Sequence, residues 1–169
     1  MSVEVEPVQI ALEFLHRIHP AGPWVLTAIH PDRGAPLITQ SFTPEMAAAC
    51  KSFIRAHNGT RNLYYSVNEP KGLPTKKSTK KDIHRIHYLH VDIDPEDNET
   101  SEAAKQRILA SVQEYSLTPT EVVNSGNGIQ LLFRLEAPIA ADEDSIRDIE
   151  ARNHALALAF KCDPCTKRR

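Results

Sequence analysis

Two carboxylates lie two residues apart in residues 90–95, which read His-Val-Asp-Ile-Asp-Pro. Successive side chains of a strand point to opposite faces, so Asp92 and Asp94 would share one face. We expect that face to be wet and anionic, with Tyr88 and His90 on it as well. The other face would carry the apolar side chains of Leu89, Val91 and Ile93.

Carboxylates two residues apart on a strand are separated by about 6.6 Å along its axis. Such a pair can bracket two divalent cations about 3.5–4 Å apart, with substrate phosphates completing their coordination. The pattern therefore predicts a metal site at Asp92 and Asp94. The alternative stays open that Asp94 and Pro95 only end a strand.

A second motif, Ser125-Gly126-Asn127-Gly128, separates two apolar segments. Its amides and the Ser125 hydroxyl can hold phosphate oxygens. In the segment that follows, Gln130 and Arg134 alternate onto one face. If that face adjoins Asp92 and Asp94, both residues would reach the same substrate. The alternative is an ordinary hairpin turn built on Asn-Gly.

The elements that must position these motifs follow from periodicity and turn signals. We expect helices over residues 7–19, 43–56, 100–116 and 143–160, and strands over 23–30, 36–42, 62–68, 85–94, 120–123 and 129–135. Thr43, Pro44 and Glu45 read as a capped helix start. From residue 85 onward the order is strand, helix, strand, turn, strand, helix, which is typical of an α+β fold with an antiparallel hairpin.

The composition is that of a globular protein. The 169 residues are 41% hydrophobic and 25% charged, with a net charge of −2, and one domain of this length buries a substantial core. No apolar run is long enough to span a membrane. The N-terminal residues are acidic and lack the basic region of a signal peptide, which predicts a cytoplasmic location and no membrane partner.

Residues 71–85 form a basic segment that contains six Lys or Arg residues and one Asp. Lys76, Lys77, Lys80 and Lys81 would contact the backbone of a nucleic acid, independently of its sequence. A solvated loop without a binding role is the alternative. Cys162 and Cys165 have the spacing of half a zinc site, but a closed structural site needs four ligands and there is no second pair.

Taken together, the motifs resemble those of the archaeo-eukaryotic primase superfamily, in the RepB-like branch of primase-polymerases that phages, prophages and plasmids carry. Asp92-Ile93-Asp94 resembles the family's acid-x-acid strand, and residues 124–138 resemble its Ser/Gly turn and polar strand. The resemblance implies an RRM-like catalytic core over residues 61–169. Residues 1–60 would be an N-terminal α/β portion of the same single domain, 1–169.

The resemblance implies a DNA-dependent primase and polymerase that transfers nucleotides with two Mg²⁺ or Mn²⁺ ions in DNA replication. Asp92, Asp94 and Asp163 would be its catalytic, metal-binding acids. The nucleotide-binding residues would be Ser125, Gly126, Asn127, Gly128, Gln130 and Arg134. Its partners would be nucleoside triphosphates, a single-stranded DNA template and a replicative helicase.

The chain departs from the family pattern at two places. Many members have His where this chain has Gln130, which can donate a hydrogen bond to phosphate but carries no charge. Relatives continue into an Asp-rich and Arg-rich stretch that supplies or supports the third acid, whereas this chain ends at Arg169. We therefore expect a C-terminally truncated domain in which Asp163 is the late candidate. The alternative function is a catalytically inactive replication accessory that binds nucleic acid.

Overall fold

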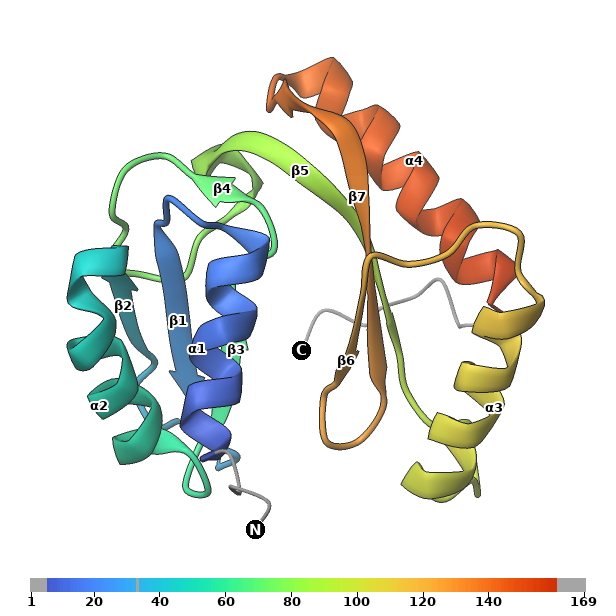
Figure 1. Cartoon of the computed structure of the whole chain (residues 1–169), viewed down its shortest axis with the longest axis horizontal. Coiled ribbons are helices and arrows are strands. Elements are labelled where there is room, and N and C mark those ends of the chain that lie inside the picture. The colour runs from blue at the N-terminus through green and yellow to red at the C-terminus, as the bar shows by residue number, and fades with distance from the viewer. Residues whose placement is uncertain (1–5, 33, 161–169) are drawn as a thin grey trace, which may run out of the picture. The chain divides into compact units, whose positions relative to one another are not determined.

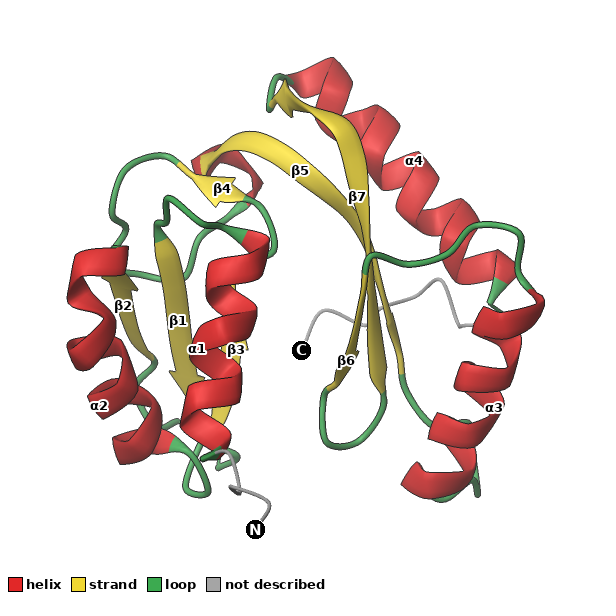
Figure 2. Cartoon of the chain, in the orientation of Figure 1, coloured by secondary structure: helices red, strands yellow, loops and turns green. Residues whose placement is uncertain are grey.

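The computed structural model of the chain describes residues 6–32 and 34–160. The chain divides into two compact units, Met1–Arg85 and Ile86–Arg169, and each is described by itself. The first unit contains α1 (Pro7–Ile18), β1 (Trp24–Ile29), β2 (Ile38–Phe42), the 3₁₀ helix η1 (Pro44–Met46), α2 (Ala47–His57), β3 (Asn62–Tyr65), β4 (Glu69–Pro70) and the 3₁₀ helix η2 (Lys80–Asp82). Strand β5 (Ile83–Ile93) begins in the first unit and continues in the second. It is followed by α3 (Ser101–Glu114), β6 (Glu121–Asn124), β7 (Ile129–Ala140) and α4 (Glu143–Ala159) (Figures 1 and 2).

The first unit is built on an antiparallel three-stranded sheet in the order β2-β1-β3. The β1–β2 pair is the hairpin that the sequence predicts, with Trp24 opposite Phe42. Helices α1 and α2 pack against each other beside this sheet (Figure 1). Strand β1 is buried from Trp24 to Ala28, so this unit has its own core.

The strand that carries the Asp pair belongs to a sheet in the order β4-β5-β7-β6. Within the first unit, β4 pairs only with the start of β5, where Glu69 lies opposite Arg85. Within the second unit, β6 and β7 form an antiparallel hairpin whose turn is residues 125–128. Strand β7 therefore lies between β5 and β6, which brings the two sequence motifs onto neighbouring strands.

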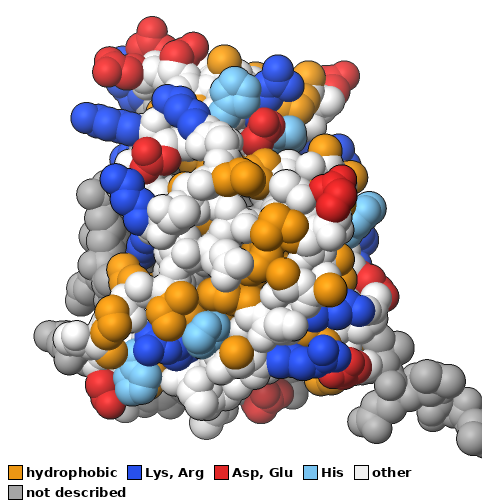
Figure 3. Space-filling model, turned by 90° about the vertical axis from the view of Figure 1, so that its left-hand side faces the viewer, with side chains coloured by type: hydrophobic (Ala, Val, Ile, Leu, Met, Phe, Trp, Pro, Cys, Tyr) orange, Lys and Arg blue, Asp and Glu red, His pale blue; other side chains and the backbone are white. Residues whose placement is uncertain are grey.

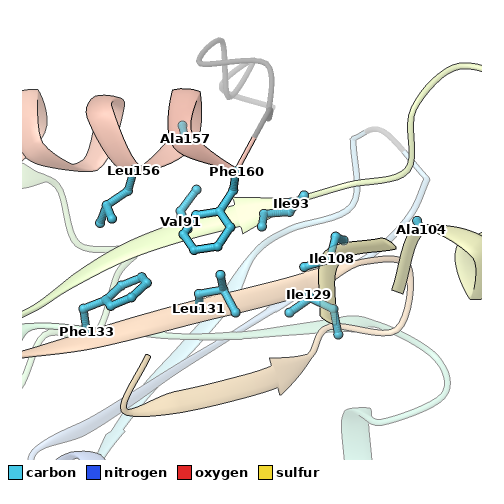
Figure 4. Close-up of a cluster of buried hydrophobic side chains, with 10 residues drawn as sticks. All are labelled: Val91, Ile93, Ala104, Ile108, Ile129, Leu131, Phe133, Leu156, Ala157 and Phe160. Carbon is cyan, nitrogen blue, oxygen red and sulfur yellow. The ribbon is translucent and has the colours of Figure 1, made fainter. Parts of the chain in front are cut away.

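Helices α3 and α4 cover one face of β5 and β7. Figure 4 shows the apolar side chains that meet there, and they come from all four elements: Val91, Ile93, Ala104, Ile108, Ile129, Leu131, Phe133, Leu156, Ala157 and Phe160. Both helices begin at side-chain caps. Thr100 Oγ1 accepts from Ala103 N at 3.3 Å, and Asp142 Oδ1 accepts from Ser145 N at 2.8 Å. Such caps satisfy amides that a helix start leaves without an internal acceptor.

The α+β fold class and the predicted order of helices and strands are confirmed. The predicted helix start is confirmed in position, with Thr43 at the N-cap, Pro44 in the first turn and Glu45 as its acid, but the cap is not made by the Thr43 side chain. That side chain makes no capping hydrogen bond and instead bonds to Glu45, and the first turn is the 3₁₀ helix η1. Strand β4 and helix η2 were not predicted, because short elements leave no periodic pattern. In the described residues, no helix has the length and apolar composition needed to cross a bilayer.

Candidate metal and nucleotide site

The alternation predicted for the Asp strand is present in β5. Val91 and Ile93 are buried in the core beneath α3 and α4, whereas Asp92 and Asp94 point to the other face and are exposed. We call the face of β5 and β7 that carries these carboxylates the acidic face. The strand thus holds both carboxylates on one side, where a cation from solvent can approach them.

Gln130 of β7 lies opposite Asp92 and donates a side-chain hydrogen bond to its carboxylate. Two further contacts indicate the same alignment of β5 with β7. Gly128 lies against Ile93 and Asp94, and Arg134 acts electrostatically on Tyr88. The partners advance in opposite directions along the two strands, as an antiparallel pair requires. The expectation that the polar strand adjoins the Asp pair is therefore correct for Gln130.

The environment of Asp92 disfavours its charged form. The Asp92 side chain is exposed on one side, but nearby protein atoms partly desolvate its carboxylate and raise its pKa above the ordinary value, and repulsion from Asp94 raises it further. His90 and the hydrogen bond from Gln130 act in the opposite direction and lower this pKa. A divalent cation between the carboxylates would remove the repulsion and stabilise the ionised form.

The Gly turn touches the Asp strand at Gly128. A Cβ atom built on Gly128 would overlap the carbonyl oxygen of Ile93 and lie 3.1 Å from Asp94 Cα. Only a residue without a side chain allows the two backbones to approach so closely. The turn is thereby held next to the second carboxylate of the pair.

The amides of this turn are largely used within it. Ser125 N donates to Gly128 O at 3.1 Å, Gly126 N donates to Asn124 Oδ1 at 3.0 Å, and Gly128 N donates to Ser125 Oγ at 3.2 Å. The expectation that these amides are open to phosphate is therefore wrong for the structure as described. The Ser125 hydroxyl accepts in its bond with Gly128, so its own hydrogen remains able to donate.

Asn127 points from the turn toward the start of α3, where Ser101 Oγ donates to Asn127 Oδ1 at 2.9 Å. This bond ties the turn to the helix that follows the Asp strand. Nothing in the sequence spacing indicated this contact, because the two residues lie 26 positions apart. Asn127 therefore helps to hold the turn beside α3, and its predicted contact with phosphate stays a prediction.

The acidic face is smaller than the alternation predicts. Tyr88 on β5 and Leu132 on β7 are 1% and 0% exposed, so this part of the face is neither wet nor anionic. Burial in the desolvated interior is what raises the pKa of Tyr88. The open part is confined to the end that carries Asp92, Asp94 and the turn.

Arg134 is exposed and lies beside Tyr88 at the far side of this buried part. Four residues of strand separate it from Gln130, which corresponds to about 13 Å. The structure therefore brings Gln130 to the Asp pair but leaves Arg134 at a distance along the strand. The guanidinium of Arg134 could therefore reach a bound substrate only from the side away from the turn.

His90 lies next to Asp92 on the acidic face and is partly buried. Its Nδ1 atom is buried and has no hydrogen-bond partner. Its backbone N–H donates to Asn153 Oδ1 of α4 at 3.0 Å. Sequence reasoning did not single out Asn153, although a polar residue in the apolar stripe of a predicted helix was a visible signal.

The basic segment is folded by its own polar contacts. Thr79 donates from its amide and its hydroxyl to Asp82 Oδ2, at 2.7 and 2.8 Å, and Lys71 Nζ donates to Lys81 O at 2.7 Å. The four lysines predicted to contact nucleic acid are exposed and belong to the first unit: Lys76, Lys77, Lys80 and Lys81. The visible face in Figure 3 carries scattered Lys and Arg side chains around hydrophobic ones.

The ligand set for a metal is incomplete in the part of the chain that the structure describes. Within residues 6–32 and 34–160, no three His, Cys, Asp or Glu side chains converge as a cation site. Asp92 and Asp94 supply two carboxylates that fit hard cations such as Mg²⁺ or Mn²⁺. Asp163, the predicted third acid, and the Cys162–Cys165 pair lie outside the described residues.

No protein-family model, curated protein or solved structure matches the chain. The family resemblance of the two motifs therefore stays a prediction that rests on their residues and on the geometry given above.

Proposed function

We propose that the chain is a primase-polymerase catalytic domain of the archaeo-eukaryotic primase type, with an RRM-like core. The observation that supports this most strongly is the meeting of both motifs at one place. Asp92 and Asp94 share the exposed end of β5, Gln130 bonds to Asp92, and Gly128 packs against Asp94. If the strand end and the hairpin turn had no shared role, we would not expect their polar groups to converge.

In this proposal Asp92 and Asp94 hold Mg²⁺ or Mn²⁺, with Asp163 as the further acid. When bound, such cations lower the pKa of a primer 3′-hydroxyl and offset the negative charge of a triphosphate. Gln130 holds the Asp92 carboxylate through its side-chain hydrogen bond and would contact the nucleotide from that position. The 3′-hydroxyl would lose its proton to water, its oxygen would bond to the α-phosphorus, and the bond to pyrophosphate would break.

Ser125 would donate its hydroxyl hydrogen to the triphosphate, while Gly126, Asn127 and Gly128 hold the turn beside Asp94. Arg134 would contact the nucleotide or primer on the side away from the turn. The basic segment would contact the single-stranded template through its four exposed lysines, in a manner that depends on salt. A replicative helicase is a further partner of this proposal.

A second function is a non-catalytic single-strand binder. It is favoured by the two facts that the described residues offer two carboxylates rather than three and that the turn amides bond within the turn. This function needs the lysines and not the Asp pair. It predicts single-strand binding that falls with added salt and does not change with Mn²⁺.

A primer-synthesis assay with labelled nucleotides on a single-stranded template separates the two. We expect product from the wild-type chain with Mn²⁺ or Mg²⁺ and none from Asp92→Ala/Asp94→Ala. A matched control, Asp144→Ala/Asp148→Ala, removes the same charge from exposed positions on α4. Equal product from the wild type and the Asp92/Asp94 variant would refute the proposed enzyme, and binding of single strands by both would then support the accessory function.

A further inference from the structure

Asn153 stands in the apolar stripe of α4. Ile149, Leu156 and Phe160 are buried at 7%, 6% and 2% exposure, and Asn153 lies four residues after the first and three before the second. Helical neighbours at these spacings share one face, so Asn153 faces the same core. An apolar residue would pack better at this position, which indicates that the amide has a specific partner.

That partner is the backbone of the Asp strand. Asn153 Oδ1 accepts from His90 N at 3.0 Å, across 63 residues of sequence. Backbone N–H groups alternate between the two edges of a strand, so those of residues 90, 92 and 94 point to one edge. Strand β4 pairs with β5 only near Arg85. The Asn153 side chain therefore takes the place of a neighbouring strand two residues before Asp92.

The His90 ring leaves its Nδ1 atom buried without a hydrogen-bond partner, and the ring interacts electrostatically with Asp92. The Asp pair follows directly along the chain, and its two carboxylates repel each other when no cation is present. The bond from Asn153 is thus a side-chain contact that holds the backbone where the Asp pair begins, in addition to the pairing of β5 with β7.

We propose that Asn153 is a positioning residue for Asp92 and Asp94, acting through the backbone of His90. This inference rests on the proposed metal site and deepens it. Residues that orient metal ligands in this indirect way change metal affinity by about 10- to 100-fold when they are replaced. Replacing Asn153 should therefore weaken cation binding even where folding is preserved.

The test uses two substitutions in the full chain. Asn153→Leu keeps the size, removes the acceptor and adds apolar surface to the stripe, which offsets the lost hydrogen bond in overall stability. Asn153→Asp keeps an acceptor oxygen for the His90 N–H but adds a charge. His154→Asp adds the same charge at the next, exposed position and serves as its matched control.

The measurements are Mn²⁺ affinity by calorimetry, thermal unfolding, and exchange of the His90 amide hydrogen. We expect Asn153→Leu to melt near the wild-type temperature, to exchange the His90 amide faster, and to bind Mn²⁺ about tenfold more weakly. Asn153→Asp should bind at least as tightly as His154→Asp. This separation of affinity from stability would not arise from a purely structural role.

Three results would overturn the inference, and each has a different cause. Wild-type Mn²⁺ affinity in Asn153→Leu, alongside lost binding in Asp92→Ala/Asp94→Ala, would refute the positioning role and leave the metal site intact. An Asn153→Leu chain that does not fold would show that Asn153 serves folding as a whole. Absence of Mn²⁺ binding in the wild-type chain would refute the proposed function and this inference with it.

Discussion

The contact between the Gly turn and the Asp strand can be tested by adding one carbon atom. In Gly128→Ala the new Cβ would overlap Ile93 O and lie 3.0 Å from Ile93 C and 3.1 Å from Asp94 Cα. All three are backbone atoms of Ile93, the last residue of β5, and of Asp94, which follows it, so they cannot rotate away as a side chain would. The two strands must therefore separate at the position where Asp94 begins to leave the sheet.

The expected loss of unfolding free energy follows from this geometry. Overpacking of well-packed sites costs typically about 1–3 kcal/mol, and backbone neighbours place this site at about 3 kcal/mol. Gly126→Ala is the matched control in the same turn, where a Cβ would meet nothing within 4 Å. Its φ of +96° still strains any side chain, at a cost of roughly 1–2 kcal/mol. The two alanines thus separate a steric cost near Asp94 from a conformational cost away from it.

The assay is urea unfolding followed by circular dichroism, together with Mn²⁺ affinity by calorimetry. Gly128→Ala should lose more unfolding free energy than Gly126→Ala and should also bind Mn²⁺ more weakly, because Asp94 is displaced. Gly126→Ala should lose stability without a comparable loss of affinity. If Gly128→Ala is no less stable than Gly126→Ala and binds Mn²⁺ like the wild type, the close contact of Gly128 with the Asp strand does not position Asp94.

Three further predictions concern charge. The pKa of Asp92 is raised in the folded chain, so its charge opposes folding. Asp92→Asn should therefore melt higher than the wild type at pH 7 without metal, with the difference vanishing below about pH 4. The Arg107 guanidinium lowers the pKa of Glu99 to about 2, so Glu99→Gln should be less stable than the wild type at pH 7, with the difference lost as the pH falls toward 2 in urea unfolding. Replacing the four exposed lysines of the basic segment by alanine should weaken single-strand binding and flatten its salt dependence by about 3 units of slope, and an unchanged slope would exclude them as phosphate contacts.

The sequence predicted those parts of the structure that depend on local pattern. Alternation placed Asp92 and Asp94 opposite Val91 and Ile93, and the Gly-containing turn correctly predicted the β6–β7 hairpin. The adjacency of Gln130 to Asp92 followed once both strands were assumed to lie side by side. These features need only the period of a strand and the geometry of a hairpin.

Other features depend on packing between distant segments and left no local pattern. The burial of Tyr88 and Leu132, which shortens the acidic face, is a tertiary effect that alternation cannot predict. The turn amides looked available because a sequence does not show that Asn124 and Ser125 accept from them. Asn153 is an intermediate case, since its polarity in an apolar stripe was visible but its partner was not.

The central claim is that Asp92 and Asp94 hold a divalent cation together with a nucleoside triphosphate. Calorimetric titration of a deoxynucleoside triphosphate, with and without Mn²⁺, into the wild-type chain and into Asp92→Asn/Asp94→Asn tests it most directly. We predict binding by the wild type that requires Mn²⁺ and is lost in the double variant, while both chains remain folded. Equal binding by the two chains, or wild-type binding that does not depend on Mn²⁺, would contradict the claim.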